Sequence, residues 1–217
     1  MKLFIDTAKL QDIEELVPLG IIDGVTTNPS LLAKVGGDPR AVLKRICDVV
    51  QGPVSAEVVA TDGDGMVREG RELAAIDPHI VVKVPFGKAG VKACRTLANE
   101  GTRVNVTLIF SPAQALLAAK VGASFVSPFV GRLDDIATSG MDLIAQLVEI
   151  FGNFEFSTEV LVASVRGPIH IIESARMGVD VCTCPPKVIE ALFNHPLTEI
   201  GLEKFLVDWA KAQQPVG

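Results

Sequence analysis

The chain has 217 residues, of which 48% are hydrophobic and 21% charged, so it is long enough to bury one sizeable core. Its formal net charge of −6 excludes a nucleic-acid groove, which needs a basic stripe. We find no apolar run of membrane-spanning length, no signal-peptide core and no linker. We therefore expect a single domain over residues 1–217 with no membrane partner, and the four cysteines, which lack zinc-site spacing, indicate reduced thiols in the cytoplasm.

Short apolar strands alternate with helices along the chain. Strands are predicted to begin near Leu3, Gly24, Val54, Ile80, Val104, Phe125, Val160 and Val181. Helices are predicted over residues 10–16, 39–50, 65–75, 89–99, 112–121, 142–151 and 168–177, with Asp38 and Ser111 as N-caps. Eight strands alternating with helices predict an α/β fold, a single (β/α)₈ TIM barrel. A doubly wound open sheet is the alternative, but no G-x-G-x-x-G motif supports it.

One more helix, at about residues 198–213, follows the eighth strand unit. Its apolar residues fall at positions i, i+3, i+4 and i+7 and form a narrow stripe of Leu202, Phe205, Leu206 and Trp209. Because a barrel is complete by this point, the stripe is expected to pack on the outside of the barrel or on a neighbouring subunit.

The fourth strand holds a lysine, Lys83, in the middle of an apolar run over residues 80–86. Such a run is typical of a strand buried on both faces. A lysine amine held in an apolar pocket is a nucleophile that forms Schiff bases with carbonyl substrates. The alternative is an edge strand whose lysine prevents aggregation.

Side chains alternate along a strand, so position parity separates the barrel interior from the face that meets the helices. Ile80, Val82 and Val84 must meet the helices, which sends Lys83 into the barrel. The same rule predicts that Val162 and Ser164 share one face of strand seven. It places further polar residues inside the same end of the barrel as Lys83: Asp6, Asn28, Glu57, Asn105, Thr107, Ser127 and Ser164. That end is the C-terminal face, where active sites of this fold lie. In the structural alternative, Asp6 and Asn28 cap helices and Glu57 only neutralises Lys83.

Two arginines follow the late strands. Arg132 and Arg166 come just after strands six and seven, where barrels often bind phosphate, and the planar guanidinium suits that anion. The alternative is a pair of solvated loop arginines. His79, His170 and His195 lie outside the inward-facing set, which argues against a zinc-dependent aldolase.

Six motifs occur in order along the chain: FIDTA at 4–8, GVTTNPS at 24–30, VKVP at 82–85, NVTLIF at 105–110, VSPFVGR at 126–132 and ASVR at 163–166. With them the chain resembles the transaldolase family, in the short subfamily shared with fructose-6-phosphate aldolases. The resemblance runs from Met1 to the last helix. It implies a (β/α)₈ barrel, Schiff-base chemistry with no metal and no organic cofactor, and transfer of a dihydroxyacetone unit between sugar phosphates in the non-oxidative pentose phosphate pathway.

The resemblance also implies roles for residues of the inward-facing set. Lys83 attacks the ketose C2 carbonyl, and Asp6 takes the C4 hydroxyl proton. Glu57 and Thr107 hold a catalytic water. The three-carbon unit is oriented by Asn28, Asn105 and Ser127, and the phosphate is held by Ser164, Arg132 and Arg166. Short members of the family form ring-shaped pentamers, sometimes stacked in pairs, so we expect a homo-oligomeric pentamer or decamer.

Two other functions stay open from the sequence. One is a dihydroxyacetone-forming aldolase of the same subfamily, whose members typically have glutamine in place of Glu57 and tyrosine in place of Phe129. The chain contains no tyrosine, so the phenol of that branch is missing. The other is a non-catalytic sugar-phosphate-binding barrel, against which Lys83, Asp6 and Glu57 argue together.

Overall fold

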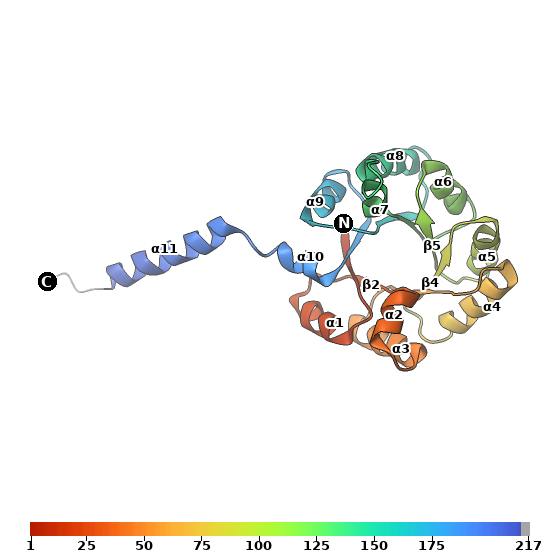
Figure 1. Ribbon diagram of the computed structural model, residues 1–217, viewed down its shortest axis with the longest axis horizontal. Coiled ribbons are helices and arrows are strands. Elements are labelled where there is room, and N and C mark those ends of the chain that lie inside the picture. Colours follow the sequence, from red (N-terminus) through yellow and green to blue (C-terminus); the bar gives the residue numbers. More distant parts are fainter. Residues whose placement is uncertain (214–217) are drawn as a thin grey trace.

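Eight parallel strands close into a barrel in the computed structural model, which describes residues 1–213 (Figure 1). Each strand pairs with the next in the chain, and β8 pairs back with β1. The strands are β1 Lys2–Asp6, β2 Gly24–Thr26, β3 Val54–Glu57, β4 Ile80–Pro85, β5 Val104–Ile109, β6 Phe125–Pro128, β7 Glu159–Val162 and β8 Val181–Cys184. The predicted barrel is confirmed, and every strand begins within one residue of its predicted start.

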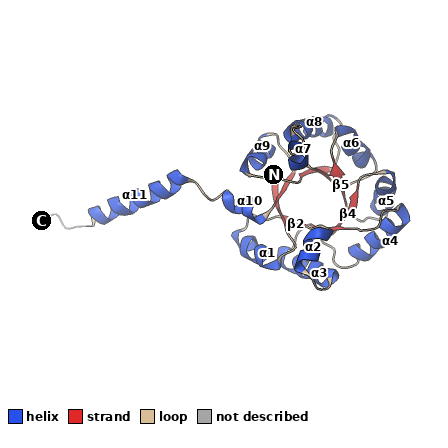
Figure 2. Cartoon of the chain, viewed as in Figure 1, coloured by secondary structure: helices blue, strands red, loops and turns tan. Residues whose placement is uncertain are grey.

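The helices form a ring outside the strands (Figure 2). Seven match predicted helices: α1 Leu10–Leu16, α3 Pro39–Val50, α4 Gly63–Ala74, α5 Lys88–Asn99, α6 Pro112–Lys120, α8 Gly140–Asn153 and α9 Pro168–Arg176. Asp38 and Ser111 cap α3 and α6 as predicted, because their side chains accept backbone N–H bonds from Arg40 and Gln114.

Three short helices were not predicted: α2 Pro29–Val35, α7 Val130–Asp134 and α10 Pro186–Ala191. Each has at most seven residues and begins within three residues of the end of a strand. Together with a 3₁₀ turn, η1 Val17–Leu19, they are too short to show a clear helical period. Because α2 and α7 follow β2 and β6 directly, they shape the C-terminal face of the barrel.

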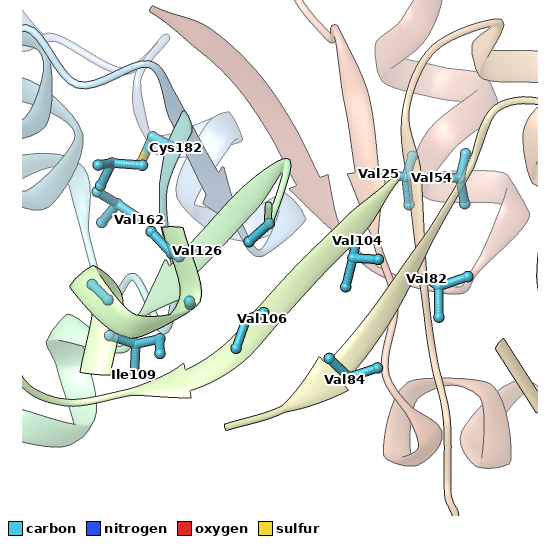
Figure 3. Packing of buried hydrophobic residues seen from close by; sticks show 14 of the residues in the cluster. Val25, Val54, Val82, Val84, Val104, Val106, Ile109, Val126, Val162 and Cys182 are labelled. Carbon is cyan, nitrogen blue, oxygen red and sulfur yellow. The ribbon is translucent and has the colours of Figure 1, made fainter. Parts of the chain in front are cut away.

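Two apolar layers stabilise the barrel. The outward-facing strand residues, which include Val82, Val104 and Val126, pack against the ring of helices (Figure 3). The barrel interior is filled by a separate cluster of Phe4, Val81, Phe125, Leu161, Ala163 and Val181. This interior cluster closes the barrel below the polar residues that lie further along the strands, so the polar end opens on one face only.

Two residues with left-handed backbone interrupt the alternation of the strands. Leu108 has a φ of +59°, and the register with β6 shifts between Val106 and Ile109, so both of these neighbours face the helices. Ser164, just after β7, has a φ of +61°. The prediction that Val162 and Ser164 share one face is therefore wrong: Val162 packs against the helices, whereas Ser164 turns back to the barrel mouth.

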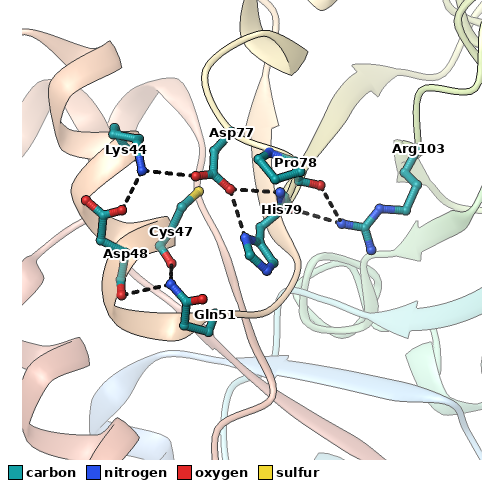
Figure 4. A network of polar contacts seen from close by, with 8 residues as sticks. All are labelled: Lys44, Cys47, Asp48, Gln51, Asp77, Pro78, His79 and Arg103. Carbon is teal, nitrogen blue, oxygen red and sulfur yellow. Dashed lines mark hydrogen bonds and ion pairs between the residues drawn. The ribbon is translucent and has the colours of Figure 1, made fainter.

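A polar network ties α3 to the start of β4 at the opposite, N-terminal end (Figure 4). Asp77 accepts hydrogen bonds from the backbone N–H of His79 at 2.9 Å and from Lys44 at 3.1 Å, and its carboxylate lies 2.8 Å from Nδ1 of His79. The His79 backbone bond, assisted by the other two contacts, lowers the pKa of Asp77 to about 2. Arg103, which precedes β5, extends the network by donating to the carbonyl of His79 at 3.2 Å.

All four cysteines are buried and free. Cys47 lies in α3 and Cys94 in α5, and burial raises the pKa of each thiol to about 12. Cys182 and Cys184 lie on the helix-facing side of β8, with their Sγ atoms 3.8 Å apart. They serve as small apolar side chains in the layer between strands and helices.

The last helix, α11 Pro196–Ala212, projects away from the barrel (Figure 1). Leu202, Phe205, Leu206 and Trp209 are each between 59% and 72% exposed. The additional C-terminal helix is confirmed, with bounds within two residues of the prediction. Among residues 1–213, no helix is long and apolar enough to cross a membrane.

Candidate active site

Lys83 lies near the C-terminal end of β4 with its side chain 7% exposed. Its Nζ is 2.9 Å from Oε2 of Glu57 on the neighbouring strand and donates to the carbonyl of Thr27 at 3.2 Å. Because β4 is hydrogen-bonded to both β3 and β5, the alternative of an edge strand is wrong. A buried amine beside one carboxylate has a base at hand to remove its proton.

The polar residues converge on a cavity of about 290 Å³ at the C-terminal ends of the strands. Eight predicted site residues other than the lysine line this cavity or a neighbouring opening of about 440 Å³, and Lys83 lines both. The two remaining predicted residues, Asn105 and Thr107, line neither space and lie fully buried on β5. The other lining residues are Asp6, Asn28, Ser127, Phe129, Arg132, Ser164 and Arg166, and Glu57 borders the wider opening.

Asp6, at the end of β1, is held by a chain of hydroxyls. Its Oδ1 accepts a hydrogen bond from Thr26 Oγ1 at 2.7 Å, and Thr26 Oγ1 is 2.7 Å from Thr183 Oγ1. Since Thr26 has one hydroxyl proton and gives it to Asp6, Thr183 must be the donor to Thr26. Burial raises the pKa of Asp6, and the Thr26 hydrogen bond and the charge of Lys83 oppose that rise only in part.

The two helix-capping alternatives have opposite outcomes. Asp6 caps no helix, because α1 begins after Lys9 and its cap makes no side-chain bond. Asn28 does cap α2, since its Oδ1 accepts from the backbone N–H of Leu31 at 2.9 Å. Asn28 also lines the cavity. The cap uses only its Oδ1, so its amide nitrogen is left to bind a ligand.

The amide of Asn105 is fixed at both ends. Its Nδ2 donates to Ser55 Oγ at 3.1 Å on β3, and its Oδ1 accepts from Ser127 Oγ at 2.8 Å on β6.

The hydroxyl of Thr107, two residues further along β5, is not held by a hydrogen bond within residues 1–213. Among the described residues, its buried Oγ1 has no hydrogen-bond partner. Buried hydroxyls are normally paired, so Thr107 fits a residue that interacts with a ligand of the site.

The two arginines are held in different ways. Arg132 lies over the ring of Phe129, with its guanidinium carbon 4.7 Å from the ring centroid. It belongs to α7, just beyond β6 as predicted, so the alternative of a loop arginine is wrong for this residue. Arg166 does lie in a loop, and its Nη2 is 2.7 Å from Oδ2 of Asp135. Both arginines line the same cavity as Lys83.

Sequence reasoning missed four residues of the site: Ser55, Thr26, Leu108 and Thr183. Parity already placed Ser55 and Thr26 on the inner faces of their strands, and Thr183 lies opposite the two cysteines of β8. Leu108 gave no signal, because leucine has no preference for a left-handed backbone. Within residues 1–213, no group of three or more His, Cys, Asp or Glu side chains is placed to hold a metal ion.

A closed (β/α)₈ barrel with polar groups gathered at the C-terminal ends of its strands is the architecture of a barrel enzyme. A family model described as Transaldolase/Fructose-6-phosphate aldolase matches residues 3–215. The chain belongs to this family.

Individual relatives agree with the family model. A protein of Rhodospirillum centenum named probable transaldolase is 60% identical over 217 residues, which cover 100% of this chain and 94% of that protein. Proteins with the same name from Methanococcus maripaludis and Aquifex aeolicus are 59% and 56% identical, over 96% and 99% of this chain and 97% and 99% of their own lengths.

Proposed function

We propose that the protein is a transaldolase. It converts sedoheptulose 7-phosphate and glyceraldehyde 3-phosphate into erythrose 4-phosphate and fructose 6-phosphate through a Schiff base on Lys83, in the non-oxidative pentose phosphate pathway. The observation that carries the proposal is the position of Lys83. Its amine is buried 2.9 Å from the Glu57 carboxylate, in a cavity that is also lined by two arginines.

The first half of the reaction forms the covalent link. The Lys83 amine attacks the C2 carbonyl of the donor ketose, which gives a carbinolamine and then, after loss of water, an imine. Glu57 accepts a proton from Nζ and, together with the unpaired hydroxyl of Thr107, holds the water that leaves and later returns. The imine is protonated and can accept an electron pair.

The second half breaks and remakes a carbon–carbon bond. Asp6 takes the proton of the C4 hydroxyl, the C3–C4 bond breaks, and its electrons move into the imine to give an enamine on Lys83. The aldose phosphate leaves. The enamine then attacks the carbonyl of the incoming aldehyde, Asp6 returns the proton, and water releases the new ketose. The raised pKa of Asp6 suits a group that both takes and returns a proton.

The remaining residues of the site bind and orient the sugar. Asn28, Asn105 and Ser127 hold the hydroxyls of the three-carbon unit. Ser164, Arg132 and Arg166 hold the phosphate, for which the planar guanidinium groups are suited. Phe129 supports Arg132 and presents an apolar ring to the enamine. An apolar ring gives the enamine carbon no proton, which favours transfer to an aldehyde over release of dihydroxyacetone.

Two measurements test the function together. Reduction with borohydride in the presence of fructose 6-phosphate should label Lys83 in peptide mass spectra, while Lys88 and Lys92, on the neighbouring helix α5, serve as internal controls. Fructose 6-phosphate alone should release little dihydroxyacetone, and added erythrose 4-phosphate should speed turnover strongly. Lys83→Arg should abolish labelling, because guanidinium does not deprotonate near neutral pH.

Two results would reject the transaldolase proposal. Labelling elsewhere with Lys83 unmodified rules out the Schiff base assigned here. Release of dihydroxyacetone as fast without an acceptor as transfer with one indicates an aldolase of the same family instead. If the protein is a transaldolase, Phe129→Tyr, alone or with Glu57→Gln, should move activity towards release of dihydroxyacetone.

We also propose that residues 1–217 form a single domain and that the protein works as a homo-oligomer, a pentamer or a decamer, in which α11 packs on a neighbouring subunit. The exposed stripe of Leu202, Phe205, Leu206 and Trp209 supports this assembly. The four free, buried thiols support a location in the cytoplasm.

A further inference from the structure

The loop over residues 163–167, between β7 and α9, carries both Ser164 and Arg166. Its backbone is unusual, since Ser164 has a φ of +61°, a left-handed conformation that a residue with a Cβ adopts only when its surroundings impose it. The contacts that hold this loop therefore decide where the Ser164 hydroxyl and the Arg166 guanidinium lie.

The first half of the loop is held by the backbone of α7. The N–H groups of Val130 and Gly131 donate to the carbonyls of Ala163 and Ser164, each at 3.1 Å. The approach requires a glycine, because a Cβ at position 131 would lie 2.1 Å from the Ser164 carbonyl oxygen. These two bonds reach no further than the carbonyl of Ser164, so they leave the backbone N–H of Arg166, two residues later, without an acceptor.

A histidine side chain holds the second half. Nδ1 of His170, in the first turn of α9, accepts the backbone N–H of Arg166 at 3.1 Å. Nε2 of the same ring lies 2.9 Å from Oδ2 of Asp134, and the ring is 15% exposed. Because a backbone N–H can only donate, Nδ1 carries no proton here, and the ring proton is on Nε2, facing Asp134.

Asp134 is itself fixed in place. Its other oxygen, Oδ1, accepts the backbone N–H of Gly140 at 2.9 Å, at the start of α8. The carboxylate therefore selects the tautomer of His170 and orients the ring. Many functional histidines are held in this way by a carboxylate that does not itself contact the ligand. The chain of contacts runs from α8 through Asp134 and His170 to the Arg166 backbone.

We propose that His170 is a positioning residue for the phosphate end of the site, with Asp134 fixing its tautomer. The inference rests on the proposed function, in which Ser164 and Arg166 bind the substrate phosphate. Losing the bond to the Arg166 N–H frees the loop and raises KM for phosphorylated sugars. It leaves kcat unchanged, because Lys83 and Asp6 lie on β4 and β1 and make their hydrogen bonds and ion pair with Thr27, Glu57 and Thr26 rather than with the loop.

A capping role is the competing explanation. His170 is the third residue of α9, and a side chain at that position can satisfy an N–H group just before a helix. A cap affects the stability of α9 and not the affinity for phosphate. The two roles are therefore separated by substrate kinetics rather than by melting temperature.

Two substitutions of similar size each remove one of the two contacts of the His170 ring and keep the other. In His170→Asn, the amide oxygen takes the place of Nδ1, so the bond to Arg166 is kept and the contact with Asp134 is lost. In His170→Gln, the longer side chain reaches Asp134, and the Arg166 N–H loses its acceptor. Arg166→Ala serves as the reference for a lost phosphate contact, and Glu173→Gln, on the same helix, controls for changes in α9.

The measurements are KM and kcat for fructose 6-phosphate, kcat/KM for unphosphorylated fructose, and the inhibition constant of inorganic phosphate. His170→Gln should raise both KM and the inhibition constant by about three- to ten-fold, as expected for one lost hydrogen bond. Its kcat and its kcat/KM for fructose should stay within about two-fold of the unmodified protein, which is less than the effect of one lost bond. His170→Asn should remain near the unmodified protein in all four values.

The inference is overturned if His170→Gln and His170→Asn change KM equally, if only the melting temperature falls, or if kcat falls instead of KM rising. Arg166→Ala separates this failure from that of the proposed function. A normal KM in Arg166→Ala removes the phosphate assignment and this inference together. A raised KM in Arg166→Ala with a normal KM in His170→Gln removes this inference alone.

Discussion

At the scale of single residues, Asp6 shows how the site favours reactivity over stability. Burial raises its pKa, so the folded protein holds its ionised form less readily than the unfolded chain does. A carboxyl group whose pKa is raised by folding stabilises the fold only below its unfolded pKa, and that contribution is lost as pH rises through the folded value. At neutral pH the burial of ionised Asp6 therefore lowers the free energy of unfolding, and the Thr26 hydrogen bond reduces that loss.

Thr26→Val should move the acidic limb of the pH profile of kcat/KM to higher pH. Valine keeps the shape of threonine but removes the hydroxyl that donates to Asp6 and lowers its pKa. Asp6 is needed as a carboxylate, so activity is then lost at a higher pH on acidification. The check is kcat/KM measured across the acidic limb.

Thr27→Val is the matched control for this prediction. The Thr27 hydroxyl donates to the carbonyl of Ser55 at 2.7 Å and does not contact Asp6. This variant should lose stability while its acidic limb stays in place. A limb that moves to lower pH in Thr26→Val, or moves equally in both variants, contradicts the account of Asp6.

At the scale of elements, the sequence predicted the regular parts of the barrel well. Strict alternation in β4 and β3 indicated that Lys83 and Glu57 face inward, and the structure places their charged groups 2.9 Å apart. This works because a strand buried on both faces leaves its side chains only two directions. The cavity residues Asp6 on β1 and Ser127 on β6 followed from the same rule.

The irregular parts were not predictable for physical reasons. The short helix α7 gives no readable period in five residues, so the helix that carries Arg132 was not predicted. Ser164 and Leu108 adopt left-handed backbone that their residue types disfavour, and only tertiary contacts impose it. Parity therefore failed from Val162 onward, where the chain leaves the strand and alternation no longer holds.

Asp77 connects α3 to β4 and gives an element-scale prediction. Asp77→Asn removes the charge that Lys44 and His79 contact, and should lower Tm by roughly 2–4 °C at neutral pH. The pKa of Asp77 is lowered on folding to about 2, so its stabilisation is present above the unfolded pKa and is lost as pH falls through the folded value. The Tm difference should therefore shrink on acidification from about pH 4 to about pH 2.

Asp48→Asn is the control for the Asp77 prediction. Asp48 contacts the same Lys44, but as an exposed pair within α3, and such pairs contribute little. Thermal melts of both variants over the same pH range make the comparison. If the two variants lose equal stability at neutral pH, or if the Asp77→Asn difference grows on acidification, the network does not act as described.

At the scale of the whole molecule, α11 is the element without a partner in one chain. Removing the residues after Thr198 deletes the stripe of Leu202, Phe205, Leu206 and Trp209, whose burial against a second copy supplies apolar contact area. We expect the truncated protein to form smaller particles in light scattering. The barrel itself should remain folded by circular dichroism, because no residue of α11 is buried in it.

Point substitutions on α11 serve as the control for the truncation. Phe205→Ser with Trp209→Ser should reduce particle size as the truncation does, because it removes only apolar surface. Lys204→Ser with Asp208→Ser, on adjacent positions of the helix, should leave particle size unchanged. A truncated protein that keeps its full mass per particle refutes the proposed role of α11.

The four buried thiols decide whether the protein recovers after heating. In the folded barrel, burial keeps Cys47 and Cys94 in the unreactive thiol form, and Cys182 and Cys184 are enclosed between strand and helices. Opening the barrel exposes all four at once, with ordinary reactivity. In air, we expect thiols of different chains to form disulfides before the chains refold, which would make inactivation irreversible at a rate set by the opening of the barrel. A reducing agent makes the same transition reversible.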